Sequence, residues 1–423
     1  MNILPNSFEP ISLKRLASLN PYVSLPKSGA VDYVPMENIH QGYLDHQTEE
    51  ISSLPSSLNA FSEGNILLAK VTPCFENGNI AIASNLLTGV GLCSTELFVL
   101  RIHSDKILPE YLMLLLQDDQ FKKEAKSYMR GTGGLKRIPT DWLMSRKFLI
   151  PSLKHQRLII QAMSSSDSLI QDIQKGFKET LDRLSSYRQS LITRAVTKGL
   201  DPNVEMKDSG VEWIGNIPKN WLIPTLSHVC RSMRNGYVGP TDGLFVPDGI
   251  KYVQSLHVKN GEIDFSVKEY YVREEWAKTH PKLRKGNLVI VQTGDIGQVG
   301  VVRQNLHNSN CHALIICDIK DDICNVDFLS FYFQSKPGKE LLLLTKTGLG
   351  LPHLNTGKVC YCKVPLPPLE EQKRISIYCS NIERQICKAE KTIRETILKL
   401  KEYRSSLISA AVTGQLVIDE AAE

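Results

Sequence analysis

The 423-residue sequence lacks the marks of several common protein classes. No apolar run approaches the roughly 20 residues that a membrane-spanning helix needs, and the polar start Met1–Pro5 does not resemble a signal peptide. The ten cysteines include no Cys-x-x-Cys pair, which argues against a disulfide framework and favours reduced thiols. Cys360 and Cys362 have no second pair of ligands nearby. We therefore expect a soluble, cytoplasmic protein that has no metal site and no contact with a membrane.

Motifs of catalysis are also missing. An adenine methyltransferase would carry Asn/Asp-Pro-Pro-Tyr/Phe, but Asn20-Pro21-Tyr22 lacks the second proline. A P-loop, Gly-x-x-x-x-Gly-Lys-Ser/Thr, does not occur, and the glycines of segment 292–300 have no convincing helix behind them for a nucleotide-binding turn. The scattered histidines show no ligand spacing. We expect a chain that is not an enzyme and binds no cofactor itself.

What the sequence does contain is an internal repeat. The segment Tyr187-Arg188-x-Ser190-Leu191-Ile192 returns 216 positions later as Tyr403-Arg404-x-Ser406-Leu407-Ile408. The match runs without a gap between residues 151–197 and residues 367–413. A duplicated long segment implies two copies of whatever it carries, and therefore a protein that handles a target in two parts.

Both copies have the pattern of long helices. Apolar residues recur every seven positions, prolines stand just before each run, and Gly199 and Gly414 stand just after. We expect helices within 150–198 and 366–414 that pack on each other. Residues 159–194 alone would span roughly 54 Å, more than one DNA turn of roughly 34–36 Å. The predicted packing residues are Met163, Ile170, Phe177, Leu184, Leu191, Ile386, Ile393, Leu400 and Leu407.

The stretches before the two helices are predicted to be folded modules. Short apolar runs separated by Gly, Asn, Asp and Pro favour β-rich structure with some helices, such as 109–126. The modules share a pattern but little identity, which indicates a common frame carrying two different recognition surfaces. We assign 1–149 to the first module, 199–365 to a linker and the second module, and 415–423 to a tail. The predicted fold class is α+β with a pseudo-twofold repeat.

The charge distribution indicates where nucleic acid would bind. The formal net charge is only +5, but between residues 121 and 148 eight basic residues face two acidic ones, around the glycine-rich loop 131–135. A similar loop, 347–351, ends the second module. Asn, Gln, Lys and Thr in loops 70–79 and 292–300 suit base edges. A solvated basic face beside a turn is the alternative. The candidate DNA-binding residues are Lys70, Thr72, Asn77, Arg130, Thr132, Lys136, Arg137, Gln292, Thr293, Gln298, Lys346, Thr347 and His353.

Three segments resemble one protein family. Segment 71–78, Val-Thr-Pro-Cys-Phe-Glu-Asn-Gly, is similar to a loop of its target-recognition domains. Segment 208–221, Asp-Ser-Gly-Val-Glu-Trp-Ile-Gly-x-Ile-Pro-x-x-Trp, resembles the entry to its second recognition domain. Segment 367–375, Pro-Pro-Leu-Glu-Glu-Gln-Lys-Arg-Ile, resembles the start of its spacer helix; the first copy departs here, with Lys154-His155 in place of the two glutamates. The family is that of type I restriction–modification specificity subunits (HsdS), and the resemblance covers essentially the whole chain.

The resemblance implies two target-recognition domains joined by an antiparallel pair of spacer helices. Each domain would read one half of a bipartite, asymmetric double-stranded DNA target, with a gap set by the helices. Two methyltransferase subunits and the restriction subunits would bind this chain, and those partners would use S-adenosylmethionine, ATP and Mg. The competing hypothesis is a coiled-coil scaffold with two protein-binding modules, which predicts no DNA affinity.

Overall fold

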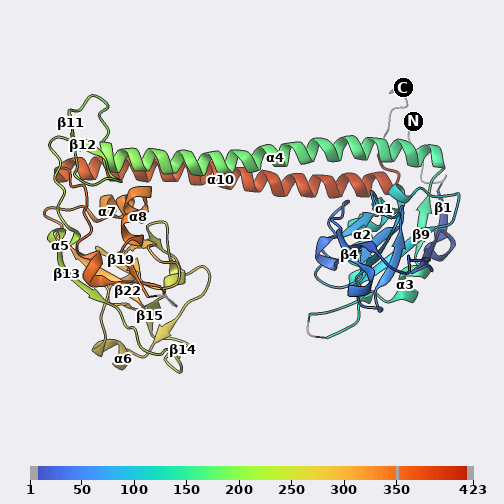
Figure 1. Cartoon of the computed structure of the whole chain (residues 1–423), viewed down its shortest axis with the longest axis horizontal. Coiled ribbons are helices and arrows are strands. Elements are labelled where there is room, and N and C mark those ends of the chain that lie inside the picture. The colour runs from blue at the N-terminus through green and yellow to red at the C-terminus, as the bar shows by residue number, and fades with distance from the viewer. Residues whose placement is uncertain (1–7, 133, 349–351, 417–423) are drawn as a thin grey trace. The chain divides into compact units, whose positions relative to one another are not determined.

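The computed structural model describes residues 8–132, 134–348 and 352–416 (Figure 1). The chain forms two compact units, which we call unit 1 (1–177 with 394–423) and unit 2 (178–393). Each unit therefore contains one module and about half of each long helix. The structure mixes helices and sheets, so the predicted α+β class is confirmed. Gly133 and residues 349–351 of the two predicted loops lie outside the described residues.

The two predicted long helices are confirmed as α4 (Leu153–Lys198) and α10 (Leu369–Val412). Gly199 directly follows α4 with φ of 76°, and Gly414 follows α10 with φ of 74°. A left-handed residue at this place ends a helix, and glycine adopts that conformation without a steric penalty. Both helices thus stop where the sequence supplies a glycine.

A buried glutamine fixes the start of each long helix to its module. Gln156 accepts a hydrogen bond from Leu108 N (2.8 Å) and donates to Lys106 O (2.7 Å) and Pro151 O (2.9 Å). Gln372 makes the same three bonds in unit 2, with Asn325 N (2.7 Å), Ile323 O (3.0 Å) and Pro367 O (2.8 Å). Both glutamines are fully buried. The repeated Gln therefore clamps the long helix to the turn before α1 (Pro109–Gln117) in unit 1 and before α7 (Val326–Gln334) in unit 2.

The long helices pack antiparallel within each unit. In unit 1, the first half of α4 shares a core with the last turns of α10, and Arg404 binds Asp167 through Nε and Nη2 at 2.8 Å each. In unit 2, the last half of α4 shares a core with the first turns of α10, and Arg188 lies 3.8 Å from Glu383. The two ion pairs occupy the same repeat positions. The pseudo-twofold repeat is therefore visible in contacts as well as in sequence.

The predicted packing residues lie on the covered side of the helices. Met163, Ile170 and Ile386 are buried. The remaining six are half-buried, because a helix that contacts one other helix covers each side chain only in part: Phe177, Leu184, Leu191, Ile393, Leu400 and Leu407. Tyr187 and Tyr403, which are equivalent in the repeat, are exposed.

The module of unit 1 contains two four-stranded sheets. The first has the order β2-β9-β6-β7, and the second has the order β4-β3-β8-β5. The first sheet consists of β2 (Ala17–Leu19), β9 (Leu97–Ile102), β6 (Ile66–Ala69) and β7 (Ile80–Ile82). The second consists of β4 (Gln47–Glu50), β3 (Ala30–Val34), β8 (Val90–Cys93) and β5 (Asn59–Ser62).

The module of unit 2 repeats the first sheet in full and the second sheet in part. Its first sheet, β13-β22-β19-β20, follows the same strand order, and its second, β14-β18-β15-β21, keeps one parallel pair as in unit 1. The strands are β13 (Cys230–Asn235), β22 (Leu314–Ile319), β19 (Asn287–Val291), β20 (Val299–Val301), β14 (Phe245–Val246), β18 (Tyr271–Val272), β15 (Ile250–Val253) and β21 (Asn310–Cys311). Two modules with little sequence identity thus share one frame.

Helices and short strand pairs complete both modules. The predicted helical segment 109–126 contains two helices, because Asp118 caps the second through the amide of Phe121 (3.2 Å). The helices are α1 (Pro109–Gln117), α2 (Asp119–Tyr128) and α3 (Thr140–Ser145) in unit 1, and α5 (Leu226–Val229), α6 (Glu274–Thr279), α7 (Val326–Gln334), α8 (Lys336–Leu343) and α9 (Thr356–Val359) in unit 2. The strand pairs are β1 (Glu9–Ser12) with β10 (Lys147–Ile150), β11 (Met206–Asp208) with β12 (Asn216–Pro218), β16 (Val258–Lys259) with β17 (Glu262–Ile263), and β23 (Lys346–Thr347) with β24 (His353–Leu354).

In the part of the chain that the structure describes, no helix combines the length and the apolar character needed to cross a membrane.

Candidate nucleic-acid interface

The candidate residues of unit 1 come together where two loops pack on each other. The amide of Thr72 donates to Lys136 O (3.0 Å), and the amide of Lys136 donates to Thr72 Oγ1 (3.0 Å). Thr72 Oγ1 in turn donates to Gly134 O (2.5 Å). Arg130 and Arg137 pair through their backbones, at 3.0 and 2.8 Å. The loop after β6 and the loop after α2 therefore form one surface.

Most candidate side chains of this surface point to solvent. Asn77, Arg130, Thr132, Lys136 and Arg137 are all exposed. Thr72 is buried, and its hydroxyl is held by the contacts described above. The structure thus places Thr72 as a link between the loops, with the other residues around it.

Carboxylates from inside and outside the predicted basic run neutralise part of its charge. Lys126 binds Glu76 at 2.6 Å, and Arg137 binds Glu96. Lys122 and Arg146 also have acidic partners, Asp119 and Glu124. Among the described residues no carboxylate lies within 4.0 Å of the remaining four basic side chains, which are Lys123, Arg130, Lys136 and Lys147. The excess positive charge is smaller than the local sequence indicates.

The Arg137–Glu96 contact is a two-point salt bridge. Arg137 Nε donates to Glu96 Oε2 at 2.9 Å, and Nη2 donates to Oε1 at 2.8 Å. The hydrogen bonds from Arg137 hold the pKa of Glu96 below its ordinary value, and the nearby charge of Lys70 adds to this effect. The amide of Lys70 also donates to Glu96 O (3.1 Å). Glu96 therefore lies between two of the predicted DNA-binding residues.

The candidate residues of unit 2 gather around the β23–β24 pair. The amide of Leu354 donates to Gln292 O (3.0 Å), and Gln292 Nε2 donates to Leu354 O (2.9 Å). Thr347 Oγ1 lies 3.2 Å from His353 Nε2. Gln292 is only 9% exposed, so its amide group serves the contact between the loops. Thr293 and Lys346 are exposed, and half-buried Gln298 donates to Asp295 at 3.1 Å.

Both units hold these loops with the same backbone hydrogen bonds. In unit 1, Lys70 N donates to Glu96 O and Ile138 N donates to Lys70 O (3.0 Å). In unit 2, Gln292 N donates to Ala313 O (3.1 Å), and Leu354 N donates to Gln292 O. The equivalent positions carry Glu96 and Arg137 in one unit but Ala313 and His353 in the other. We call this shared arrangement the loop frame. Sequence analysis missed Glu96 and Ala313, because only the β-sheet pairing brings them beside the loops.

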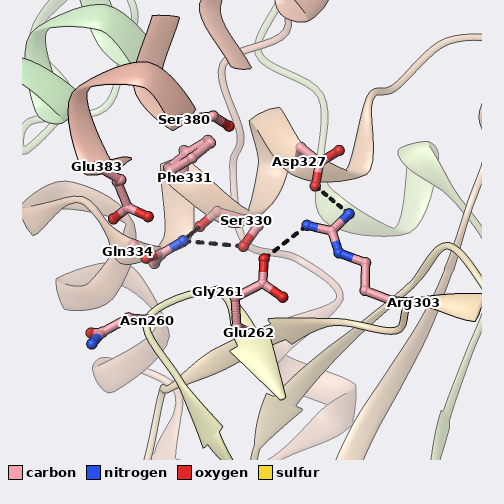
Figure 2. Close-up of a pocket in the computed structure, with 10 residues that line it drawn as sticks. All are labelled: Asn260, Gly261, Glu262, Arg303, Asp327, Ser330, Phe331, Gln334, Ser380 and Glu383. Atoms are coloured by element: carbon pink, nitrogen blue, oxygen red, sulfur yellow. Dashed lines mark hydrogen bonds and ion pairs between the residues drawn. The ribbon is translucent and has the colours of Figure 1, made fainter. Parts of the chain in front are cut away.

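A polar cavity lies elsewhere in unit 2, between β17, α7 and α10 (Figure 2). Its volume is about 180 Å³, and Arg303 crosses it to bind Glu262 (3.0 Å) and Asp327 (2.9 Å). Gln334 donates to Ser330 Oγ at 3.2 Å. Burial raises the pKa of Glu383 at the cavity wall. None of the candidate DNA-binding residues lines this cavity, and the described residues include no group of three or more His, Cys, Asp or Glu suited to a metal ion.

Comparison with known proteins identifies the second module directly. Residues 218–399 match the family model described as the type I restriction modification DNA specificity domain. The chain is 31% identical over 206 residues to the type I restriction enzyme EcoAI specificity subunit of Escherichia coli, a match that covers 48% of this chain and 34% of the relative. It is 24% identical over 298 residues to the MjaVIII specificity subunit of Methanocaldococcus jannaschii, covering 69% of this chain and 67% of that protein. The chain thus spans about a third of the length of its E. coli relative.

Solved structures share the fold over nearly the whole chain. A chain from a structure that addresses complex assembly and conformational transition of the type I R-M system superposes with a TM-score of 0.75 at 18% identity, covering 98% of this chain and 99% of that one. The HsdS subunit from Thermoanaerobacter tengcongensis superposes with a TM-score of 0.54 at 19% identity, covering 98% of both chains. These matches confirm the resemblance to type I restriction–modification specificity subunits that was stated from the sequence.

Proposed function

We propose that this chain is the DNA sequence-specificity subunit of a type I restriction–modification complex and that it reads a bipartite, asymmetric target. Unit 1 would read one half-site and unit 2 the other, with the gap set by α4 and α10. One observation carries the proposal: the same loop frame presents different side chains in the two units. A common frame with different exposed groups is what two different base sequences require.

The chain's own role in this proposal is binding and scaffolding without catalysis. The methyltransferase subunits would use S-adenosylmethionine, and the restriction subunits would use ATP and Mg. The complex would act in the cytoplasm on double-stranded DNA, to which Arg130, Lys136 and Lys346 would contribute phosphate contacts.

The internal repeat supports binding of two methyltransferase subunits, one at each copy. Some repeated residues are explained by packing inside the chain, as for Gln156 and Gln372. Tyr187 and Tyr403 are large aromatic side chains that are identical between the copies and 58% and 57% exposed. An exposed tyrosine supplies a large contact area at low entropic cost. We place one methyltransferase subunit at each tyrosine.

Stoichiometry tests this placement. Tyr187→Ala and Tyr403→Ala should each lower the bound methyltransferase from two copies to one, measured by native mass spectrometry of the co-expressed complex. Tyr22→Ala removes a tyrosine that is 87% exposed and lies outside the repeat, so this control should retain two copies. Two bound copies in both repeat variants would contradict the placement.

DNA binding separates the proposed function from the scaffold hypothesis. The reconstituted complex should bind and methylate a split target, and the scaffold hypothesis predicts no DNA affinity for any sequence. A filter-binding assay at several salt concentrations decides between them, because phosphate contacts make the affinity fall as salt rises.

A further inference from the structure

The guanidinium of Arg137 is fixed in direction by Glu96. A guanidinium has five N–H donors, and the carboxylate of Glu96 occupies the two that lie side by side on Nε and Nη2. The remaining fork, formed by Nη1 and the second N–H of Nη2, points away from Glu96. The Arg137 side chain is 48% exposed and that of Glu96 is 28% exposed, so this free fork is accessible from solvent.

The charges of the two side chains cancel at close range. A neutral pair attracts phosphate less than a lone arginine does, whereas its hydrogen-bonding direction is better defined. Two parallel N–H groups match O6 and N7 of guanine in the major groove. The geometry therefore suits a base edge better than the DNA backbone.

The salt bridge is not needed to build the loop frame. Unit 2 forms the same backbone hydrogen bonds with Ala313 and His353 at the positions of Glu96 and Arg137. The pair is thus a feature of one recognition surface, added to a frame that stands without it. A side-chain pair that differs between two otherwise equivalent surfaces is suited to setting specificity.

We propose that Arg137 reads a guanine in the half-site recognised by unit 1 and that Glu96 acts as the positioning residue for its guanidinium. This inference rests on the proposed function, since it names one base contact of the same DNA surface. In unit 2 the equivalent place carries His353 beside Ala313, so the two half-sites differ at this position.

The test uses the assembled complex of this chain with its methyltransferase subunits. A DNA library randomised across the unit 1 half-site is methylated with S-adenosylmethionine and sequenced, once for wild type and once for each variant. Arg137→Ala should lower the preference for guanine at one position by about 5- to 150-fold, the range for loss of a bidentate base contact. Preferences in the unit 2 half-site should stay unchanged.

Two further variants separate the effect of the direction of the Arg137 guanidinium from the effect of its charge. Arg137→Lys keeps the positive charge but loses the planar fork, so it should lose the same guanine preference. Glu96→Gln leaves the arginine charge uncompensated, so it should weaken that preference and raise the affinity for unrelated DNA, with a steeper salt dependence. Glu9→Gln is the control, because it breaks a comparably exposed ion pair with Lys106 (2.8 Å). It should change neither the guanine preference nor the affinity for unrelated DNA.

The outcomes discriminate clearly. A uniform loss of affinity in Arg137→Ala, with every base preference intact, would assign the residue to a phosphate and overturn the inference. Full guanine preference in Glu96→Gln would overturn the positioning role. A wild-type complex that methylates without any sequence preference would instead overturn the proposed function itself. Thermal unfolding of each variant confirms that the fold is retained.

Discussion

The glutamine clamp makes a quantitative prediction about how each long helix is held. Gln156→Leu keeps the approximate volume of the side chain but removes all three hydrogen bonds. Leu108 N, Lys106 O and Pro151 O then lose their buried partner. Because an unsatisfied buried polar group costs about 1–3 kcal/mol, three of them should cost about 3–9 kcal/mol of unit 1 stability. That is a large fraction of the stability of an ordinary domain.

Hydrogen exchange with mass spectrometry measures this effect locally. The turn around Leu108 and the first turns of α4 should lose protection in Gln156→Leu, and the equivalent region around Asn325 should keep it. Gln372→Leu should show the opposite distribution. Gln161→Leu changes an exposed glutamine of the same helix and should stay within about 0.5 kcal/mol of wild type. A loss below about 1 kcal/mol in both clamp variants would refute the reasoning.

Three other predictions follow from charge, length and protonation. Arg130→Ala with Lys136→Ala should weaken DNA binding for all sequences and reduce the slope of log affinity against log salt by about two, measured by filter binding; an unchanged slope would remove both from the phosphate contacts. One heptad inserted into both α4 and α10 should lengthen the gap between half-sites by about 3 base pairs or abolish recognition, since seven residues add roughly 10 Å. Methylation at the original gap would contradict the proposal that the length of the two helices sets the gap. Burial lowers the pKa of His257, whose Nδ1 accepts from Gln254 N (2.9 Å), so the unfolded state binds more protons and unit 2 should lose stability as pH falls below 6.5, the ordinary value. His257→Gln should flatten this dependence in thermal unfolding from pH 5 to 8, and an equally steep curve would contradict the assignment.

The parts of the fold that follow from local sequence were predictable. Heptad spacing, the flanking prolines and the terminal glycines predicted both long helices, and α4 ends at Lys198 as expected. The offset of 216 residues also predicted equivalent contacts, such as those of Arg188 and Arg404. Sheet order was not predictable, because strands β2 and β9 are joined only by long-range pairing.

The candidate site was predictable only where the contributing residues are close in sequence. The loop 130–137 was recognised by its charges and glycines, but its partner Glu96 comes from a turn 41 residues before Arg137. Gln292 has the amide that suits a base edge, yet the fold uses that amide for Leu354 O. A sequence pattern shows which residue types a loop contains, whereas tertiary packing decides which of them reach the surface.

The sequencing of methylated bases in the host genome, with and without this gene, tests the central claim most directly. The account predicts that deletion removes one split adenine-methylation motif, and that a copy carrying Arg137→Ala restores a motif relaxed at a single guanine. A host that expresses the complete system and keeps the same methylated motif after deletion would contradict the role of this chain as the specificity subunit.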